Sequence, residues 1–401
     1  MVSLEDLKAL AHPAQTKIVL VVLDGLGGLS RKSDNKTELE AARTPNLDKL
    51  AAEGNLGLAD PVAPGITPGS GPGHLGLFGY DPLQYRIGRG VLEAGGIDLE
   101  MTERDLAARG NFCSVDAQGL ITDRRAGRIP TEVCTRLTPL LEKIRIPKTE
   151  LIVRPVREHR FVVLFRGDGL EEGLSETDPQ DTGKPPLHVH AEMSQATRAA
   201  EVANQFVAGA KQVLSAEHPA NMVLLRGFSK YPNLPKLTDI YGVRAAVIAV
   251  YPMYRGLAKL VGMQAVRTGD TVADEISALE SVYGQFDFFF VHVKKTDSAG
   301  EDGNFDRKVA IIEEADAHIP RLMSLEPDVL VVTGDHSTPA PFRAHSWHPV
   351  PVLLWSQWCR PDGAAKFSER ECRYGNIGRI RAAELMPLIM AHAERLTKFG
   401  A

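Results

Sequence analysis

A serine lies among glycines and prolines in the segment 67–75, TPGSGPGHL, just before an apolar run that could begin a helix. On a tight turn at a helix N-terminus, Ser70 would expose its hydroxyl group beside free backbone N–H groups and the positive end of the helix dipole. A phosphoryl group is bound or accepted in such a setting. Taken alone, the same glycine-rich run is more often a plain surface loop.

Acidic and histidine residues lie at the ends of several predicted strands. They are Asp24 after 17–23, Asp297 and Glu301 after 286–293, Asp335 and His336 after 328–333, and His345 just before the strand 350–355. The carboxyl ends of parallel strands meet along one edge of a sheet, where open α/β sheets place their sites. Any one of these residues alone also fits a turn, as Asp24 does in Asp-Gly.

Carboxylates mixed with imidazoles suit Mn²⁺, Zn²⁺ or Mg²⁺, and the strand-end residues are numerous enough for two ions. Two such ions can clamp the attacking and leaving oxygens of a phosphoryl transfer. An ion next to Ser70 would lower the pKa of its hydroxyl group and make the serine a nucleophile. The pattern therefore favours metal-dependent phosphoryl transfer through Ser70.

The composition is that of a globular protein with a sizeable core. The chain has 401 residues, is 43% hydrophobic and 24% charged, and carries a formal net charge of −5. No basic tract interleaved with aromatic residues points to nucleic acid, and no apolar run approaches the ~18 residues of a membrane span. The four cysteines have no CxxC spacing, so we expect reduced thiols. We therefore expect a cytoplasmic protein without a membrane or nucleic-acid partner, as a monomer or small homo-oligomer.

Two kinds of sequence pattern predict an α/β fold of two domains. Continuous β-branched runs, as in 17–23 and 328–333, are typical of strands buried in a parallel sheet. Between residues 104 and 241, short alternating runs and turn signals instead predict a hairpin-rich sheet. We expect a discontinuous parallel-sheet core domain, 1–103 and 242–401, that is interrupted by a smaller α+β domain, 104–241.

Eight motifs make the sequence similar to a known family. They are VVLDGLGG, ARTPNLDKLAAEG, TPGSGPGHLGLFGYDP, NFCSVD, DRRAGRI, KKTDSAGEDGN, VVTGDHSTP and HSWHPVPVLL, which span nearly the whole chain. The chain resembles the archaeal type of 2,3-bisphosphoglycerate-independent phosphoglycerate mutase, in the alkaline phosphatase superfamily. The resemblance implies an alkaline-phosphatase-like core and interconversion of 3-phosphoglycerate and 2-phosphoglycerate.

The resemblance also implies a role for each strand-end residue. Ser70 would take the phosphoryl group. Asp24, Ser70, Asp335 and His336 would hold one metal ion, and Asp297, Glu301 and His345 the other. Many relatives have histidine where this chain has Glu301. A carboxylate at that position favours Mn²⁺ or Mg²⁺, with Zn²⁺ or Co²⁺ as further candidates, and Asp302 is an alternative ligand.

The inserted domain would supply the groups that hold the substrate. Candidates are Arg124, Arg125, Arg128, His159, Arg160 and Arg226, and guanidinium groups match carboxylate and phosphate well. By similarity, Asp123 would move the proton between the two hydroxyl groups of glycerate, although Asp-Arg-Arg could equally be a turn. Lys294 could stabilise the charge of the transferring phosphoryl group.

The resemblance implies that substrate binds between the domains and that closure excludes water during the transfer. Two alternatives stay open at this point. One is another enzyme on the same metal core, a phosphomonoesterase or a phosphotransferase acting on a small alcohol such as homoserine. The other is a metal-dependent binding protein without catalysis, in which Glu301 disrupts the second metal site.

Overall fold

The chain forms two compact units, each described here by itself. The structure is a computed structural model and describes residues 2–400. The core unit comprises the chain up to Arg86 and from Leu234 onward, and the inserted unit is Ile87–Asn233. The boundaries expected from the sequence, at 104 and 241, fall later in the chain than these limits. The segment 87–103, expected in the core, lies in the inserted unit.

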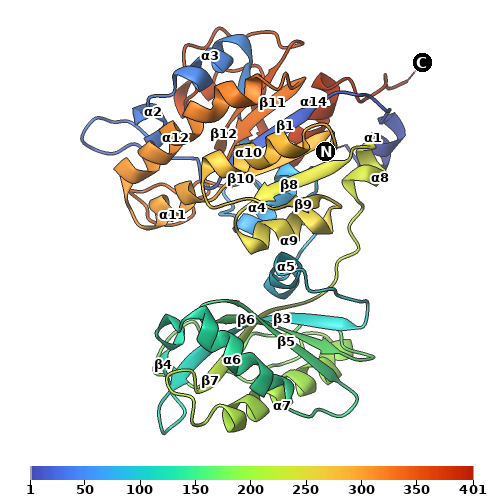
Figure 1. Ribbon diagram of the computed structural model, residues 1–401, viewed down its shortest axis with the longest axis vertical. Helices are drawn as coiled ribbons and strands as arrows, with labels where there is room; N and C mark the ends of the chain where they lie inside the picture. The colour runs from blue at the N-terminus through green and yellow to red at the C-terminus, as the bar shows by residue number, and fades with distance from the viewer. Residues whose placement is uncertain (1, 401) are drawn as a thin grey trace. The chain divides into compact units, whose positions relative to one another are not determined.

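The core unit is built on an eight-stranded sheet in the order β13-β2-β12-β11-β1-β10-β8-β9 (Figure 1). Its strands are β1 (Ile18–Leu23), β2 (Asn55–Asp60), β8 (Ala245–Ala249), β9 (Gln264–Val266), β10 (Phe288–Val293), β11 (Val329–Thr333), β12 (Val350–Ser356) and β13 (Gly378–Arg381). The central strands β11, β1, β10 and β8 are parallel, whereas β12 is antiparallel to both of its neighbours, β11 and β2. The expected α/β class is confirmed, with β12 as an exception to the parallel order.

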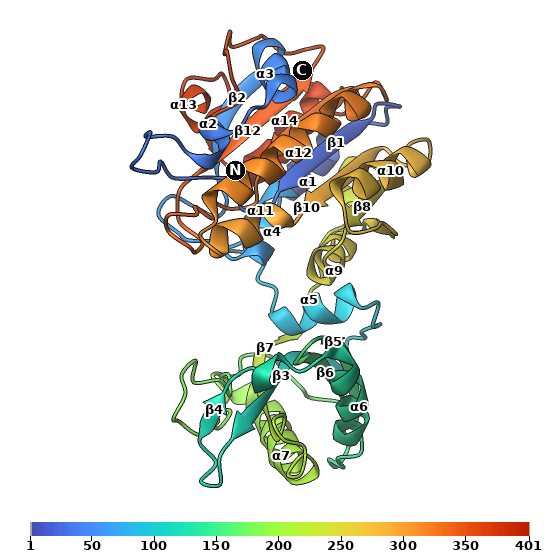
Figure 2. The same ribbon diagram turned by 60° about the vertical axis from the view of Figure 1, so that its left-hand side comes forward.

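Helices cover both faces of this sheet (Figure 2). They are α1 (Leu4–Leu10), α2 (Glu38–Ala41), α3 (Pro45–Glu53), α4 (Ser70–Leu77), α8 (Leu237–Tyr241), α9 (Pro252–Leu260), α10 (Val272–Val282), α11 (Lys295–Glu301), α12 (Phe305–Met323), α13 (Glu369–Cys372) and α14 (Leu385–His392). Apolar residues of α3, α10 and α12 pack in one cluster with Val19, Val21 and Phe289. Alternation along β10 sends Phe290 and His292 to the other face, where their rings contact α4 and α9.

The direction of β12 explains why a residue that precedes a strand can belong to the site. The carboxyl ends of β1, β10 and β11 share one edge of the sheet. Because β12 runs the other way, its amino end reaches this same edge and brings the His345 segment with it. The loop before β12 therefore lies at the same edge as the loops that follow β1, β10 and β11.

The inserted unit has a five-stranded antiparallel sheet in which the long strand β3 pairs with β4, β6 and β7. Its elements are α5 (Arg89–Gly96), β3 (Asp105–Val115), β4 (Ile121–Asp123), α6 (Thr131–Glu142), β5 (Glu150–Arg157), β6 (Arg160–Arg166), α7 (Thr197–Val213) and β7 (Met222–Lys230). Helices α6 and α7 pack on one face around Phe112, Phe161 and Phe206. A hairpin-rich sheet was expected here, and the strands of this sheet pair antiparallel.

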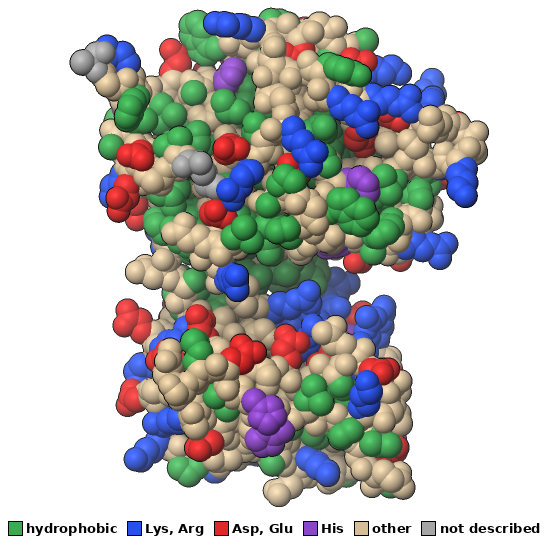
Figure 3. Space-filling model, turned by 180° about the vertical axis from the view of Figure 1, so that it is seen from behind, with side chains coloured by type: hydrophobic (Ala, Val, Ile, Leu, Met, Phe, Trp, Pro, Cys, Tyr) green, Lys and Arg blue, Asp and Glu red, His purple; other side chains and the backbone are tan. Residues whose placement is uncertain are grey.

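The surface carries both charge signs. Figure 3 shows Lys and Arg side chains interspersed with Asp and Glu side chains on the face that it presents. Within residues 2–400, no helix combines the length and apolar character that crossing a membrane requires. All four cysteines are free thiols.

Candidate active site

Ser70 is the first residue of α4, and the glycines around it permit close packing. Gly69 caps the helix in an extended conformation, and α4 runs from Ser70 to Leu77. A Cβ atom on Gly73 would lie 2.2 Å from the carbonyl oxygen of Asp335, so only glycine allows α4 to approach the loop after β11 this closely. The Ser70 hydroxyl therefore lies at a helix N-terminus, next to the strand-end residues.

His336 is the residue on which the first group of polar side chains converges. Its Nε2 atom lies 3.2 Å from Ser70 Oγ, from Asp24 Oδ1 and from Asp335 Oδ2. Asp24, Asp335 and His336 are all completely buried. Burial alone would lower the pKa of His336, but the carboxylates of Asp335 and Asp24 raise it to about 9.

Asp297 and His345 form a second group that also includes His336. The rings of His336 and His345 stack with their centroids 3.7 Å apart. His345 Nδ1 is 2.9 Å from the carbonyl oxygen of Pro68, which leaves Nε2 facing Asp297 Oδ1 at 3.5 Å. Ligand atoms of Asp24, Asp335 and His336 lie within 4.8 Å of one another, and so do those of Asp297, His336 and His345.

Glu301 lies at the margin of the second group. Its Oε1 atom is 3.9 Å from His345 Nε2, and its side chain is 58% exposed. The alternative ligand, Asp302, is 65% exposed and contacts Arg307 Nη1 at 3.3 Å. Of the two carboxylates, Glu301 is the one that faces the group, and its role as a ligand stays a prediction.

Lys294 connects the two groups electrostatically. Its Nζ atom is 2.9 Å from Asp24 Oδ2 and also donates to Asp297 Oδ2. Burial alone would lower the pKa of Lys294, but the two carboxylates raise it above its ordinary value. The pKa of Asp24 lies well below its ordinary range despite its burial, chiefly because of the Lys294 charge. Lys294 is therefore an ammonium group held at the centre of the site.

The buried oxygens of this site fit a divalent cation. Asp24 Oδ1 and Asp335 Oδ2 are buried and accept no hydrogen bond within the described chain. Leaving carboxylate oxygens without donors in the interior costs free energy, and a cation between them removes that cost. The donor set of carboxylates and imidazoles suits Mn²⁺, Mg²⁺ or Zn²⁺.

In the inserted unit, Asp123 closes the turn of the DRRAGR segment. Its two carboxylate oxygens accept the backbone N–H groups of Arg125, at 2.8 Å, and Gly127, at 2.7 Å. Ala126, Gly127 and Arg128 all have positive φ, at 47°, 62° and 53°. Left-handed backbone at a non-glycine residue is strained, so these two hydrogen bonds stabilise an unusual turn.

The remaining substrate candidates divide into two sets. Arg125, Arg128 and Arg160 surround His159, whose pKa falls to about 4 because of burial first and these positive charges second. Arg124 and Arg226 instead pair with acidic residues. Arg124 makes two hydrogen bonds to Asp178, at 2.9 and 2.7 Å, and Arg226 donates to Glu176 at 2.8 Å. The first set is the freer to bind a ligand.

Comparisons with known proteins show the family of this chain. The sequence model of the 2,3-bisphosphoglycerate-independent phosphoglycerate mutase family matches residues 51–221. A Thermotoga neapolitana protein named "Probable 2,3-bisphosphoglycerate-independent phosphoglycerate mutase" is 54% identical over 388 residues, 96% of each chain. A Thermus thermophilus protein of the same name is 50% identical over 400 residues, 98% of each chain. The chain belongs to the 2,3-bisphosphoglycerate-independent phosphoglycerate mutase family.

Two solved structures extend the likeness to the fold. A Pyrococcus horikoshii protein is 32% identical with a TM-score of 0.83, over 96% of this chain and 99% of that one. The cofactor-independent phosphoglycerate mutase of Thermoplasma acidophilum is 30% identical with a TM-score of 0.73, over 94% of this chain and 100% of that one. The fold of this phosphoglycerate mutase family member is therefore shared over nearly its whole length.

Several buried residues near the site were missed by sequence reasoning. His74 Nδ1 lies 3.2 Å from Asp335 Oδ2, and Tyr254 and His292 contact Asp24. Lys308 donates from α12 to the backbone oxygens of Gly25, Gly27 and Thr338. Only His74 carried a usable signal, because it follows Ser70 by four residues and so shares its helix face.

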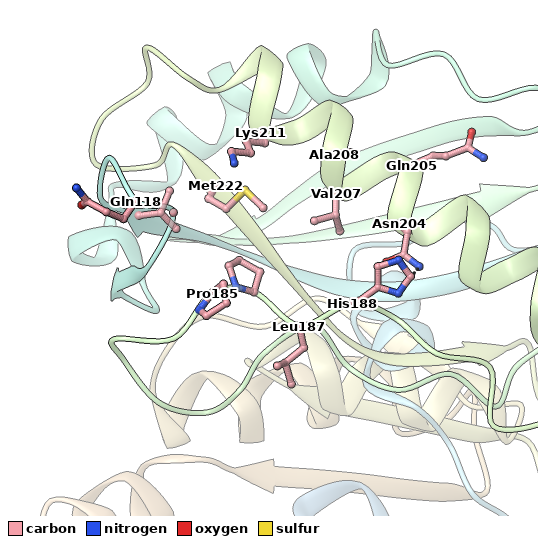
Figure 4. A pocket seen from close by; sticks show the side chains of 13 residues that line it. Gln118, Pro185, Leu187, His188, Asn204, Gln205, Val207, Ala208, Lys211 and Met222 are labelled. Atoms are coloured by element: carbon pink, nitrogen blue, oxygen red, sulfur yellow. Dashed lines mark hydrogen bonds between the residues drawn. The ribbon is translucent and has the colours of Figure 1, made fainter.

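A pocket in the inserted unit involves none of the candidate residues. It has a volume of about 570 Å³, and its lining includes Val207, Met222, Lys211 and His188 (Figure 4). Its lining combines apolar side chains with isolated polar ones. In this phosphoglycerate mutase family member, the buried polar clusters and not this pocket are the candidate site.

Proposed function

We propose that this protein interconverts 3-phosphoglycerate and 2-phosphoglycerate through a phosphoserine at Ser70, without 2,3-bisphosphoglycerate. The observation that carries the proposal is the approach of Ser70 Oγ to His336 Nε2, 3.2 Å away at the point where the two candidate metal groups meet. Family membership over nearly the whole chain supports the substrate assignment.

The metal ligands in this proposal are Asp24, Ser70, Asp335 and His336 for one ion, and Asp297, Glu301 and His345 for the other, with His336 adjacent to both. We propose Mn²⁺ as the preferred ion because Glu301 adds a carboxylate to the second group. A bound divalent cation supplies positive charge to a phosphoryl group and acidifies a neighbouring hydroxyl group.

The side chains of the core unit have three tasks in the reaction. The Ser70 oxygen attacks the phosphorus atom, and the N-terminus of α4 favours the negative charge that arrives there. Lys294 places its ammonium group beside the phosphoryl oxygens and stabilises their charge. His345, whose Nδ1 atom is occupied by the Pro68 carbonyl, keeps Nε2 directed at Asp297.

We assign the binding of glycerate to side chains of the inserted unit. Arg125, Arg128 and Arg160 supply guanidinium groups that match the substrate carboxylate. Arg124 and Arg226 act indirectly, because Asp178 and Glu176 already bind their guanidinium groups. Retained glycerate then receives the phosphoryl group on its other hydroxyl group. Loss of glycerate would make the enzyme a phosphatase.

A coupled enolase assay with 3-phosphoglycerate tests this function. Metal-stripped protein is assayed with Mn²⁺, Mg²⁺, Zn²⁺ or Co²⁺ restored in turn and with 2,3-bisphosphoglycerate omitted. We expect activity to return, most strongly with Mn²⁺. Release of inorganic phosphate without 2-phosphoglycerate would instead indicate a phosphomonoesterase, and inactivity with every ion would contradict the proposal. A cytoplasmic location and the oligomeric state stay predictions.

A further inference from the structure

The pocket of the inserted unit lies between helix α7, strand β7 and the segment 185–188 (Figure 4). Val115 of β3 and Met222 of β7 are buried residues of its lining, and both belong to a small apolar cluster apart from the main core of the unit. The volume of about 570 Å³ is in the range of small-molecule sites. None of the described residues that line the pocket is acidic.

Helix α7 lines the pocket with one face. Its lining residues include Asn204, Val207, Ala208 and Lys211. Their spacing of i, i+3, i+4 and i+7 places them on the same face of the helix. This face is apolar in the middle and polar at both ends, and its ends are about 10 Å apart along the helix axis. A ligand that contacts both ends must therefore be elongated.

The segment on the other side of the pocket is held by hydrogen bonds. The Leu187 N–H group donates to the carbonyl oxygen of Thr177 at 2.8 Å, and the His190 N–H group donates to Ser175 Oγ at 2.8 Å. Two prolines precede Leu187, and their rings fix φ. The wall is thus ordered before a ligand arrives, which lowers the entropic cost of binding.

Asn204 determines which nitrogen of His188 can donate to a ligand. The Val189 N–H group donates to Asn204 Oδ1 at 3.0 Å, and Asn204 Nδ2 donates to the Val189 carbonyl oxygen at 2.9 Å, which fixes the orientation of the amide. The same Nδ2 atom lies 3.3 Å from His188 Nδ1. Because an amide nitrogen only donates, Nδ1 is the acceptor, and neutral His188 carries its proton on Nε2.

Lys211 supplies a positive charge at the other end of the pocket. A Cβ atom on Gly119 would lie 3.9 Å from Lys211 Nζ, so the ammonium group lies beside the turn between β3 and β4. Asp116 of that turn accepts the backbone N–H groups of Gln118 and Leu120, at 3.0 and 2.9 Å. Within residues 2–400, the Lys211 ammonium group makes no ion pair. A carboxylate is the partner that such a group favours.

We propose that this pocket binds an elongated apolar molecule with a carboxylate at one end and a hydrogen-bond acceptor at the other. The carboxylate contacts Lys211, and the acceptor takes the Nε2–H group of His188. The apolar body lies against Val207, Ala208 and Met222. The inference goes beyond the proposed mutase function, because no candidate catalytic or substrate residue lines the pocket and binding is measured without turnover.

Titration calorimetry of the wild-type protein with biphenyl-4,4′-dicarboxylate tests the proposal. A Kd of about 0.1 mM is expected for a ligand of this size. Lys211→Met keeps the length of the side chain and should weaken binding about 10-fold, because it removes a charge-assisted hydrogen bond. His188→Phe keeps a ring but loses the donor, and should weaken binding about 5-fold. Ala208→Trp fills the apolar middle and should abolish binding.

Three controls accompany these variants. Lys143→Met, at an exposed lysine that caps α6, should bind the probe as wild type does. Biphenyl-4-carboxylate lacks the second acceptor, so it should bind equally to wild type and to His188→Phe. Saturating 3-phosphoglycerate should leave the Kd of the dicarboxylate unchanged. Lys211, His188 and Ala208 are exposed, so their variants should fold.

The outcomes separate this inference from the proposed function. Absence of binding heat with millimolar dicarboxylate would overturn the inference. A Kd within twofold of wild type in both Lys211→Met and Ala208→Trp would also overturn it, because the probe would then bind elsewhere. Competition by 3-phosphoglycerate would assign the probe to the candidate active site and count against the pocket. A protein that binds the probe as predicted but lacks mutase activity would contradict the proposed function alone.

Discussion

The Tyr254 hydroxyl group donates a 2.6 Å hydrogen bond to Asp24 Oδ2, inside the core unit. The Tyr254 ring also packs on His292, with centroids 3.8 Å apart, and His292 Nε2 lies 3.3 Å from the same carboxylate oxygen. Helix α9 and strand β10 together therefore orient the carboxylate at the end of β1. Residues that orient a ligand in this way influence metal affinity.

We predict that Tyr254→Phe weakens metal binding by about 10- to 100-fold. Burial and the nearby carboxylates keep the pKa of Tyr254 well above its ordinary value, so its hydroxyl group always donates. Titration calorimetry with Mn²⁺ on the metal-stripped protein measures the change. Tyr374→Phe, at a side chain that is 85% exposed, is the control. Unchanged Mn²⁺ affinity in Tyr254→Phe would show that Asp24 needs no such support.

Lys308 is predicted to hold two loops of the site together. Its buried ammonium group donates to Gly25 at 2.8 Å, to Gly27 at 3.2 Å and to Thr338 at 2.9 Å. Lys308→Met leaves these carbonyl oxygens unpaired, and we expect a loss of about 3 kcal/mol or more in the free energy of unfolding. Urea denaturation measures it. The exposed substitution Lys49→Met should stay within about 0.5 kcal/mol of wild type, and equal stability of the two variants would refute the assignment.

One pair of variants tests whether Glu301 or Asp302 is a ligand of the second metal ion. Glu301→Gln should lower affinity for the second of two Mn²⁺ ions by about 10-fold, because it removes a carboxylate 3.9 Å from His345. Asp302→Asn should leave it unchanged, because Asp302 contacts Arg307 on the surface. Electron paramagnetic resonance counts bound Mn²⁺ directly. The reverse result would make Asp302 the ligand.

Glu275 should make the stability of the protein fall as pH rises. This α10 residue is 2% exposed, and burial raises its pKa from 4.5 to about 9. Between these two pKa values, the unfolded chain releases the proton that the folded chain retains. The contribution of protonated Glu275 to stability is therefore fully present below pH 4.5 and is lost as the pH rises to about 9. Glu275→Gln should stabilise the protein by up to ~3 kcal/mol at pH 7 and by little near pH 4.5. Thermal melts across this range test it, and an unchanged pH slope would be contrary evidence.

The ligand candidates could be predicted because each is adjacent to a recognisable strand. Asp24, Asp297 and Asp335 follow β-branched or aromatic runs, and the shared edge of a parallel sheet brings such residues together. His345 came within reach only because β12 runs antiparallel, which the sequence pattern does not reveal. The expectation about His345 came from its place just before the strand 350–355, and the resemblance to the family supported it.

The supporting residues could not be predicted, because their contacts cross long stretches of chain. Tyr254 is separated from Asp24 by 230 positions and Lys308 from Gly25 by 283. His292 lies in an apolar strand, at a position where the sequence pattern predicts a core residue. A local sequence pattern does not show which residues of two distant elements contact each other.

The phosphorylation state of Ser70 during turnover tests the central claim most directly. Metal-loaded protein is mixed with 3-phosphoglycerate, quenched in acid within one turnover, digested and examined by mass spectrometry. We predict one phosphoryl group on the wild-type peptide that contains Ser70. The Ser70→Ala variant should give neither a phosphorylated peptide at this position nor 2-phosphoglycerate. Formation of 2-phosphoglycerate by Ser70→Ala at the wild-type rate would contradict the account.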